Sequence, residues 1–396
     1  MKTVLKFSCY LFAFLGVIFI PAATFLAEFQ DHFAQFVFGG IVSSFGIEDV
    51  SFSSDTQGLY LLLLILFGVA VFLSFLLNQW SYFKNRQERI IHLFKLILIY
   101  YLASRFLVYG FDKLFKTQFY LPEPNTLYTP FGKMTKDILF WSTMGTSKLY
   151  CFLTGLFELI PAVLMLFKKT RTFGLFVLLF VITNVLMINF GFDISVKLYS
   201  LFLLFICLLL LAPNIPTFYL FFKGEVAQLK VDKQNFDFLN RAFIKGFLKT
   251  GLIGLMLLEA TFFAFSTGNF NDDSAERPYL HGAYQLEDIT FGTENIYERF
   301  YIHRRGFIIF ETKGGYFLDY KLEIDSVNQQ LLIWGYDDYA NQIDYQLYGG
   351  ESKISLQWPG DSENQILMYE KLDWRSLPAL EDEFHWTIES YQTRND

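Results

Sequence analysis

Seven long apolar stretches dominate the first two thirds of this 396-residue chain. They cover residues 5–27, 58–78, 90–110, 149–167, 173–191, 196–213 and 243–266. A helix needs roughly 20 mostly apolar residues to cross a bilayer, because hydrocarbon offers no partner to free backbone groups. The run from Leu59 to Leu77 is the purest and carries no charged residue. We therefore expect a membrane α-helical bundle with seven transmembrane helices.

The charge of the chain changes sign after the last apolar stretch. Residues 1–266 hold 22 Lys and Arg against 15 Asp and Glu, whereas residues 267–396 hold 10 against 24. The acidic tail alternates apolar and polar residues, with Gly314-Gly315 and Gly349-Gly350 at hairpin positions. This pattern predicts a C-terminal antiparallel β-sandwich or barrel of six to eight strands. The acidic balance excludes nucleic acid as a partner, since phosphates need a basic surface.

These patterns divide the chain into four parts. We expect a transmembrane bundle of six spans over 1–213, a cytoplasmic amphipathic linker over 214–241, a seventh transmembrane helix over 242–266 and an extracytoplasmic acidic β-domain over 275–396. Two interpretations of the first stretch remain open. It is either a cleaved signal peptide with Lys2 and Lys6 as its basic end, or a retained anchor, which its length and Pro21 favour.

The basic residues predict how the chain is oriented in the lipid bilayer, because short loops rich in Lys and Arg stay in the cytoplasm. The loops after the second, fourth and sixth stretches are basic, whereas the loop 27–57 has five acidic residues and no Lys or Arg. The loop 111–148 disagrees, with five Lys against three acidic residues. Long loops follow the rule weakly. We expect a membrane protein with its N-terminus in the cytoplasm and its β-domain outside.

Four spans carry a polar residue at a similar expected depth. Counting ~1.5 Å per residue from the outer interface places these residues roughly 10–13 Å deep, and they are Arg105, Glu158, Asn184 and Glu259. Buried charges are costly, so each needs a partner or a role. In the structural interpretation, Arg105 pairs with Glu158 or Glu259 and locks the bundle. In the functional one, the other glutamate has no cationic partner and handles a proton or anchors a ligand.

A second polar set lies at the expected outer rim. Its candidate binding residues are Lys113, Gln118, Asp193 and Lys197. Asp193 and Lys197 are four residues apart and could simply pair along a helix. Alternatively, the rim residues and the buried layer enclose a binding pocket beneath the β-domain. Lys113 or Lys197 would then act as a base or as an anion anchor.

Several kinds of chemistry have no basis in the sequence. Cys9, Cys151 and Cys207 lie in apolar stretches without a CxxC pair, so we expect no zinc or redox-dithiol site. No pair of intramembrane histidines could hold a haem. The three tail histidines stand in ordinary strand or loop contexts, without a Ser-His-Asp set; they are His281, His303 and His385. We expect no metal and no built-in cofactor, and catalytic residues stay unassigned.

Several short motifs resemble the DoxX family of bacterial membrane proteins, above all its longer members. The main ones are Arg105-Phe-Leu-Val-Tyr-Gly-Phe-Asp-Lys113 with Gln118-Phe119, Gly155-Leu-Phe-Glu158, Ser53-Ser54-Asp55-Thr56, Met144-Gly145, Asn184-Val185 with Asn189-Phe190, and Phe192-Asp-Ile-Ser-Val-Lys-Leu198. The resemblance covers about residues 50–222. Ser54, Phe192 and Ser195 replace the Gly, Tyr and Pro of the family pattern.

The resemblance implies a location in the bacterial cytoplasmic (inner) membrane. Three hypotheses about function follow, and the resemblance implies the first of them. Some DoxX relatives are subunits of quinone-linked redox enzymes, so the chain would bind a quinone or a lipid and serve a periplasmic or membrane redox partner. Alternatively, the layer with Glu158 and Glu259 transports protons or a small solute. In the third hypothesis the chain is a non-enzymatic envelope scaffold, and its acidic β-domain docks a partner. Whether the protein is an enzyme stays open at this point.

Overall fold

The chain forms two compact units in a computed structural model, which describes residues 2–21, 25–226, 228, 242–291, 297–335, 340–358 and 365–381. Unit 1 comprises Met1–Gln118 and Leu149–Asn271, and unit 2 comprises Phe119–Lys148 and Asp272–Asp396. The segment Phe119–Lys148, which the sequence analysis assigns to the bundle, therefore folds with the tail.

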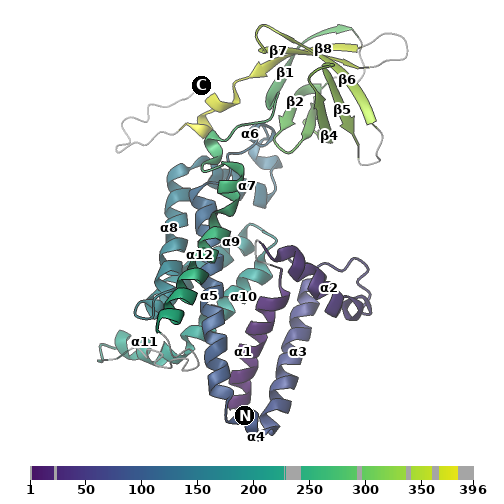
Figure 1. The fold of residues 1–396 in the computed structure, drawn as a ribbon. Helices are drawn as coiled ribbons and strands as arrows, with labels where there is room; N and C mark the ends of the chain where they lie inside the picture. The colour runs from purple at the N-terminus through teal and green to yellow at the C-terminus, as the bar shows by residue number, and fades with distance from the viewer. Residues whose placement is uncertain are drawn as a thin grey trace. The chain divides into compact units, whose positions relative to one another are not determined.

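Unit 1 is built from helices (Figure 1). Their bounds are α1 Lys2–Phe19, α2 Ala27–Ser43, α3 Gln57–Gln79, α4 Ser81–Lys84, α5 Gln87–Leu114, α8 Lys148–Met165, α9 Arg171–Gly191, α10 Lys197–Leu211, the 3-10 turn η2 Ala212–Asn214, α11 Ile215–Phe222 and α12 Ala242–Thr267. The predicted linker 214–241 includes α11, whereas residues 227 and 229–241 lie outside the described part of the chain.

Six helices of the described chain are long and apolar enough to cross a membrane. They are Gln57–Gln79, Gln87–Leu114, Lys148–Met165, Arg171–Gly191, Lys197–Phe222 and Gly246–Ser274. The predicted number of seven is not reproduced, because the first apolar helix, Thr3–Phe19, is shorter than the others. It ends two residues before Pro21, and proline disfavours a helical conformation in the residue that precedes it. The expectation of a helical unit with apolar candidate spans is otherwise confirmed.

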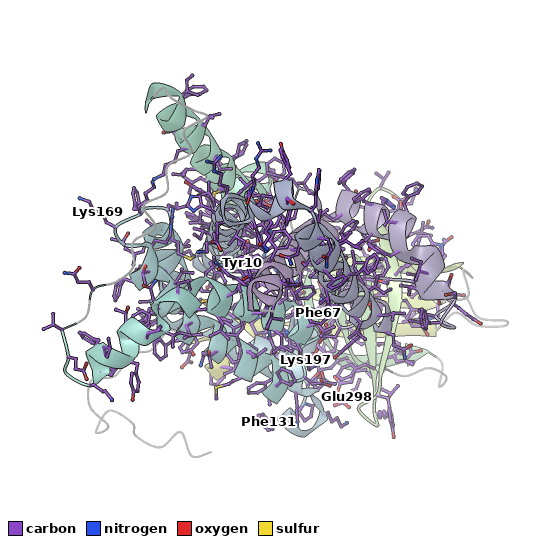
Figure 2. The ribbon with its side chains drawn as sticks, turned by 90° about the horizontal axis from the view of Figure 1, so that it is seen from below. Tyr10, Phe67, Phe131, Lys169, Lys197 and Glu298 are labelled. Carbon is purple, nitrogen blue, oxygen red and sulfur yellow. The ribbon has the colours of Figure 1, made fainter. Side chains whose placement is uncertain are left out.

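The helices of unit 1 share one apolar core. Helix α1 packs against α3 and α5, α10 packs against α9 and α5, and α12 packs against α5. Figure 2 shows Tyr10 among these helices and Lys169 at their edge. The hydroxyl of Tyr10 donates a hydrogen bond of 3.2 Å to the carbonyl oxygen of Leu209, which ties α1 to α10. Helix α5 thus contacts several neighbours and is central to the unit.

Helices α5 and α8 approach closely at two glycines. A Cβ on Gly110 would lie 2.5 Å from the Leu159 side chain, and a Cβ on Gly155 would lie 2.9 Å from the Gly110 carbonyl oxygen. Small residues at a crossing let membrane helices bring their backbones together. This crossing fixes the position of α8 along α5, and with it the partner of each charged residue nearby.

The segment 27–57, expected only as an outer loop, contains helix α2. Every fourth residue of α2 is buried, and these residues are Gln30, Ala34, Phe38 and Val42. The amide nitrogen of Gln30 donates a 2.9 Å hydrogen bond to the Val17 carbonyl oxygen, next to the end of α1. The sequence analysis missed this helix because its length and acidic residues resemble a loop more than a span.

Unit 2 contains a closed antiparallel barrel of eight strands in sequential order (Figure 1). The strands are β1 Gly282–Phe291, β2 Tyr297–His303, β3 Phe307–Thr312, β4 Phe317–Asp325, β5 Gln330–Trp334, β6 Ala340–Tyr348, β7 Lys353–Trp358 and β8 Gln365–Leu372. Pairing of β1 with β8, for instance Tyr284 with Lys371, closes the barrel. The prediction of a β-domain is confirmed, and of the two architectures left open it is the barrel. Closure also removes the exposed strand edges that invite aggregation.

Large side chains fill the barrel. Alternate residues of each strand point inward, among them Phe300 of β2 and Phe310 of β3. The ring of Tyr284 stacks on Phe300 with 4.5 Å between centroids. The interior is therefore a packed core of aliphatic and aromatic side chains, as small barrels have, and the outer wall is where a ligand could bind.

The segment Phe119–Lys148 covers part of this outer wall. It contains α6 Pro124–Leu127, the 3-10 turn η1 Phe131–Lys133 and α7 Lys136–Thr146. Helix α6 packs on β2 and β1, and the Tyr128 ring lies 6.1 Å from the outward Tyr301 ring. Four candidate spans separate this segment from the tail in sequence. An even number of crossings returns a chain to the same side, so the shared unit agrees with this pattern of spans.

Candidate functional site

One charged pair inside unit 1 joins α5 to α12. An amino group of Arg105 lies 2.5 Å from Glu259 Oε1, and the two side chains are 4% and 13% exposed. The hydroxyl of Ser104 donates a 3.0 Å hydrogen bond to the other oxygen of Glu259. Arg105 in turn donates to the Ser104 hydroxyl. Of the two partners that the sequence left open for Arg105, the structure selects Glu259.

A second buried pair joins α5 to α8. Lys113 Nζ lies 2.7 Å from Glu158 Oε2, and the side chains are 8% and 4% exposed. Lys113 also donates a 2.8 Å hydrogen bond to Gln118 Oε1. The expectation that one acid lacks a cationic partner is therefore wrong. The depth estimate counted residues along the helix, whereas the long lysine stem lets its ammonium group lie away from its own backbone level.

Three tyrosines lie between these two ion pairs. The hydroxyls of Tyr101 on α5 and Tyr199 on α10 are 2.9 Å apart. Tyr109, two turns along α5, interacts with both Tyr199 and Glu158. The tyrosine hydroxyls therefore lie within the electrostatic reach of both ion pairs, and we call these three tyrosines and the two pairs the polar network. The sequence analysis missed the tyrosines because it treated aromatic residues in the spans as lipid-facing or core.

The rim residues predicted at the start of α10 are paired with each other. Lys197 Nζ lies 2.7 Å from Asp193 and 3.5 Å from Asp55. Asp55 also accepts hydrogen bonds from the backbone N–H groups of Lys197 and Leu198, at 3.0 and 2.9 Å. These are the first N–H groups of α10, which have no partner inside the helix. Asp55 therefore caps α10, and the pairing of Asp193 with Lys197 along the chain is confirmed.

Asn184 does not join the buried layer. Its side chain is exposed on α9, whereas the neighbouring Asn189 is buried and donates a 2.6 Å hydrogen bond to the Ser200 hydroxyl. The expected single layer of four residues is therefore replaced by two ion pairs, linked by tyrosines. Counting residues inward from Asp193 gives a depth along α9 and leaves open which face of the helix meets the bundle.

Unit 2 holds a separate buried cluster around Glu123. The guanidinium of Arg304 pairs with Glu123 and, at 2.7 Å, with Asp272. His281 Nε2 lies 2.9 Å from Glu123 Oε2. Arg277 adds a 3.1 Å contact to Asp272. His281 lies in the loop just before β1, and its partner Glu123 is 158 residues away in the sequence. His385 is outside the described residues.

The electrostatics of Glu123 indicate a structural role. Burial alone raises the pKa of this carboxyl, but the His281 hydrogen bond and the Arg304 charge outweigh it and lower the pKa to about 2. A carboxylate that stays ionised at neutral pH is unsuited to donate or abstract protons there. The cluster fastens the segment Phe119–Lys148 and the residues before β1 to the β2–β3 hairpin.

The candidate functional site is therefore the polar network of unit 1. It offers tyrosine hydroxyls, a guanidinium and an ammonium group, all hydrogen-bond donors in a mostly apolar bundle. Within the described residues, no group of three or more His, Cys, Asp and Glu is arranged to hold a metal ion. The chemistry available is hydrogen bonding to an acceptor and proton exchange through hydroxyls.

Comparison with known proteins gives one relative. The uncharacterized protein YwoB of Bacillus subtilis (strain 168) is 33% identical over 120 residues, which cover 28% of this chain and 70% of YwoB. No protein-family model matches the chain. No solved structure matches it either. The identity and coverage of the Bacillus protein show that the chain belongs to the same family as the uncharacterized protein YwoB.

Proposed function

We propose that this protein is a quinone-linked subunit of a bacterial membrane redox system and carries no redox centre of its own. The observation behind this proposal is the network of Tyr101, Tyr109 and Tyr199 between two buried ion pairs. A quinone is an apolar ring with two carbonyl acceptors, so it needs an apolar site with a few hydrogen-bond donors. The resemblance to DoxX proteins supports the same ligand class. A periplasmic or membrane partner would hold the electron-transfer cofactor.

The proposed topology has the N-terminus in the cytoplasm and the acidic unit 2 outside the inner membrane. The basic loops after the second, fourth and sixth apolar stretches support it. The five lysines of loop 111–148 no longer weigh against it, since most of this loop folds with the tail. Lysines within a folded extracytoplasmic domain say little about orientation, because the positive-inside rule applies to short loops.

Quinone binding predicts a hydroxyl-specific defect. In full-length protein reconstituted with a short-chain ubiquinone analogue, Tyr101→Phe and Tyr199→Phe should each weaken binding about tenfold, the worth of one buried hydrogen bond. Tyr100→Phe is the matched control, because Tyr100 is the adjacent tyrosine of α5. Binding is measured by quenching of intrinsic fluorescence, beside a hexane extract of the purified protein. Equal affinity in all three variants, or no quinone bound by the wild type, would contradict the proposal.

Proton or small-solute transport is the second candidate, and the hydroxyl groups between the two ion pairs favour it. Tyr101 is hydrogen-bonded to Tyr199, and Tyr109 interacts with Tyr199 and Glu158, so hydroxyls are placed where they could relay protons between the pairs. Wild-type protein in liposomes should then dissipate a pH gradient, and Glu158→Gln should slow this about tenfold or more. Glu88→Gln, an exposed glutamate of α5, is the control. A wild-type flux equal to that of empty liposomes would exclude proton transport.

A further inference from the structure

A groove of about 630 Å³ lies on the outer wall of the barrel within unit 2. One side is formed by residues of the segment Phe119–Lys148, including Asn125 and Lys133, and the other by β3, β4 and the β2–β3 turn. Its volume is in the range of small-molecule sites. It is separate from the polar network of unit 1 and from the packed barrel interior.

The floor of the groove is apolar where a barrel wall is normally polar. Ile308 and Phe310 of β3 point into the barrel core. Their neighbours Phe307 and Ile309 therefore face outward and line the groove, together with Phe317 of β4. Antiparallel strands with one solvated face usually alternate apolar and polar residues. The run Phe307-Ile-Ile-Phe310 breaks this alternation, so the outward face here is suited to an apolar group.

The rim of the groove is basic, although the tail is acidic. Lys133 and Arg305 are exposed and line it, and Asp319 is the opposing charge. Burial lowers the pKa of His303, more than the nearby Glu123 raises it, so this lining histidine is largely neutral at pH 7. Lys133 Nζ donates one 3.1 Å hydrogen bond to the Gly315 carbonyl oxygen. An ammonium group has three N–H donors, so Lys133 retains two for a ligand.

Asn125 contributes a hydrogen-bond acceptor to this part of the structure. Its Oδ1 atom is buried, and among the described residues it has no hydrogen-bond partner. Asn125 lines the groove. A buried acceptor without a partner is costly, so a water or a ligand group that donates to it stabilises the site. A ligand N–H reaches this oxygen when the Asn125 side chain turns toward the groove, because the oxygen itself is buried in the free protein.

We propose that this groove binds an N-acyl amino acid with an apolar side chain, either free or as the carboxyl-terminal residue of a polypeptide. The side chain lies on Phe307, Ile309 and Phe317, and the carboxylate pairs with Lys133 and Arg305. The amide N–H donates to Asn125. Each of the three features of the groove thus has one counterpart in the ligand. The proposal is independent of quinone binding by unit 1.

The experiment uses the full chain in nanodiscs of neutral lipid, titrated with N-acetyl-L-phenylalanine by calorimetry. The amide analogue N-acetyl-L-phenylalaninamide has no charge, and 3-phenylpropionate has no N–H. We expect the uncharged amide to bind at least tenfold more weakly and 3-phenylpropionate a few-fold more weakly. A tetrapeptide ending in phenylalanine separates the two sources. If the tetrapeptide binds more tightly than N-acetyl-L-phenylalanine, the groove binds a chain end. If the tetrapeptide does not bind, the groove binds the free acid.

Variants test the residues that carry the proposal. Lys133→Gln and Arg305→Gln should each weaken N-acetyl-L-phenylalanine about tenfold and leave the affinity of the uncharged amide unchanged. Lys136→Gln is the matched control, because Lys136 is an exposed lysine of the same segment outside the groove lining. Equal affinity of the acid and its amide for the wild type overturns the proposal. So does a loss in Lys136→Gln as large as in Lys133→Gln, or no binding of any probe.

Discussion

Replacing Arg105 with leucine is expected to destabilise unit 1 by about 3–5 kcal/mol. The change leaves the Glu259 carboxylate in an apolar layer without its cationic partner, and removal of one member of a buried pair has this effect. Helix α12 is the least buried of the candidate spans in the described part of the chain, and it packs against α5. The pair with Arg105 therefore contributes much of the specificity that holds α12 in place.

The measurement is a denaturant titration of the detergent-solubilised protein, followed by loss of helical circular dichroism. Arg89→Leu is the matched control, because Arg89 is an exposed arginine of the same helix, and a change within about 0.5 kcal/mol is expected there. Arg105→Leu combined with Glu259→Leu should recover most of the loss, since no uncompensated charge then remains. A double variant as unstable as Arg105→Leu would show that the guanidinium acts through contacts other than Glu259.

The partner of Glu158 illustrates what the sequence could and could not predict. With Arg105 paired to Glu259, the sequence alone indicates that Glu158→Gln would be harmless. The structure gives Glu158 its own partner, Lys113, so the substitution leaves a buried ammonium group without its carboxylate. Residue types and depths along a helix could be estimated from the chain, because apolar runs and charges follow the bilayer. The rotation of each helix and the reach of a lysine side chain could not.

The fold was predictable to the same degree. The long apolar stretches identified the helical unit. The alternation of apolar and polar residues, with paired glycines between the strands, identified the β-domain. Both are local patterns in the sequence. The assignment of Phe119–Lys148 to the barrel depends on Glu123 and Arg304, which are 181 residues apart. A pairing over that distance has no periodic pattern. Similarly, α2 could be found only with knowledge of the α1 surface that Gln30 and Phe38 contact.

The second large effect is expected at Glu123, where acid should weaken unit 2. The folded pKa of this carboxyl is about 2, whereas an unperturbed glutamate has a pKa of about 4.5. Between these values the unfolded chain binds the additional proton, so stability is complete above the unfolded pKa and falls as the pH drops toward the folded one. The difference corresponds to about 3 kcal/mol. The lowered pKa of His303 acts in the same direction below about pH 6.5.

Glu123→Gln should therefore lower the stability of unit 2 by about 3 kcal/mol at pH 7. The stability of this variant should also change less with pH between about pH 5 and pH 2. A glutamine keeps the shape of the side chain but cannot balance the Arg304 charge. Glu323→Gln, on an exposed position of β4, is the control and should retain the wild-type pH dependence.

Tryptophan fluorescence can report on unit 2 alone. Of the six tryptophans, only Trp80 belongs to unit 1, so a Trp80→Phe background confines the signal to unit 2 during a urea titration. The buried Trp374 ring lies 5.7 Å from the His281 ring, next to the Glu123 cluster. A pH slope that persists in Glu123→Gln would place the acid-sensitive group elsewhere. A flat slope with intact stability at pH 7 would mean that Arg304 keeps its charge compensated through Asp272 alone.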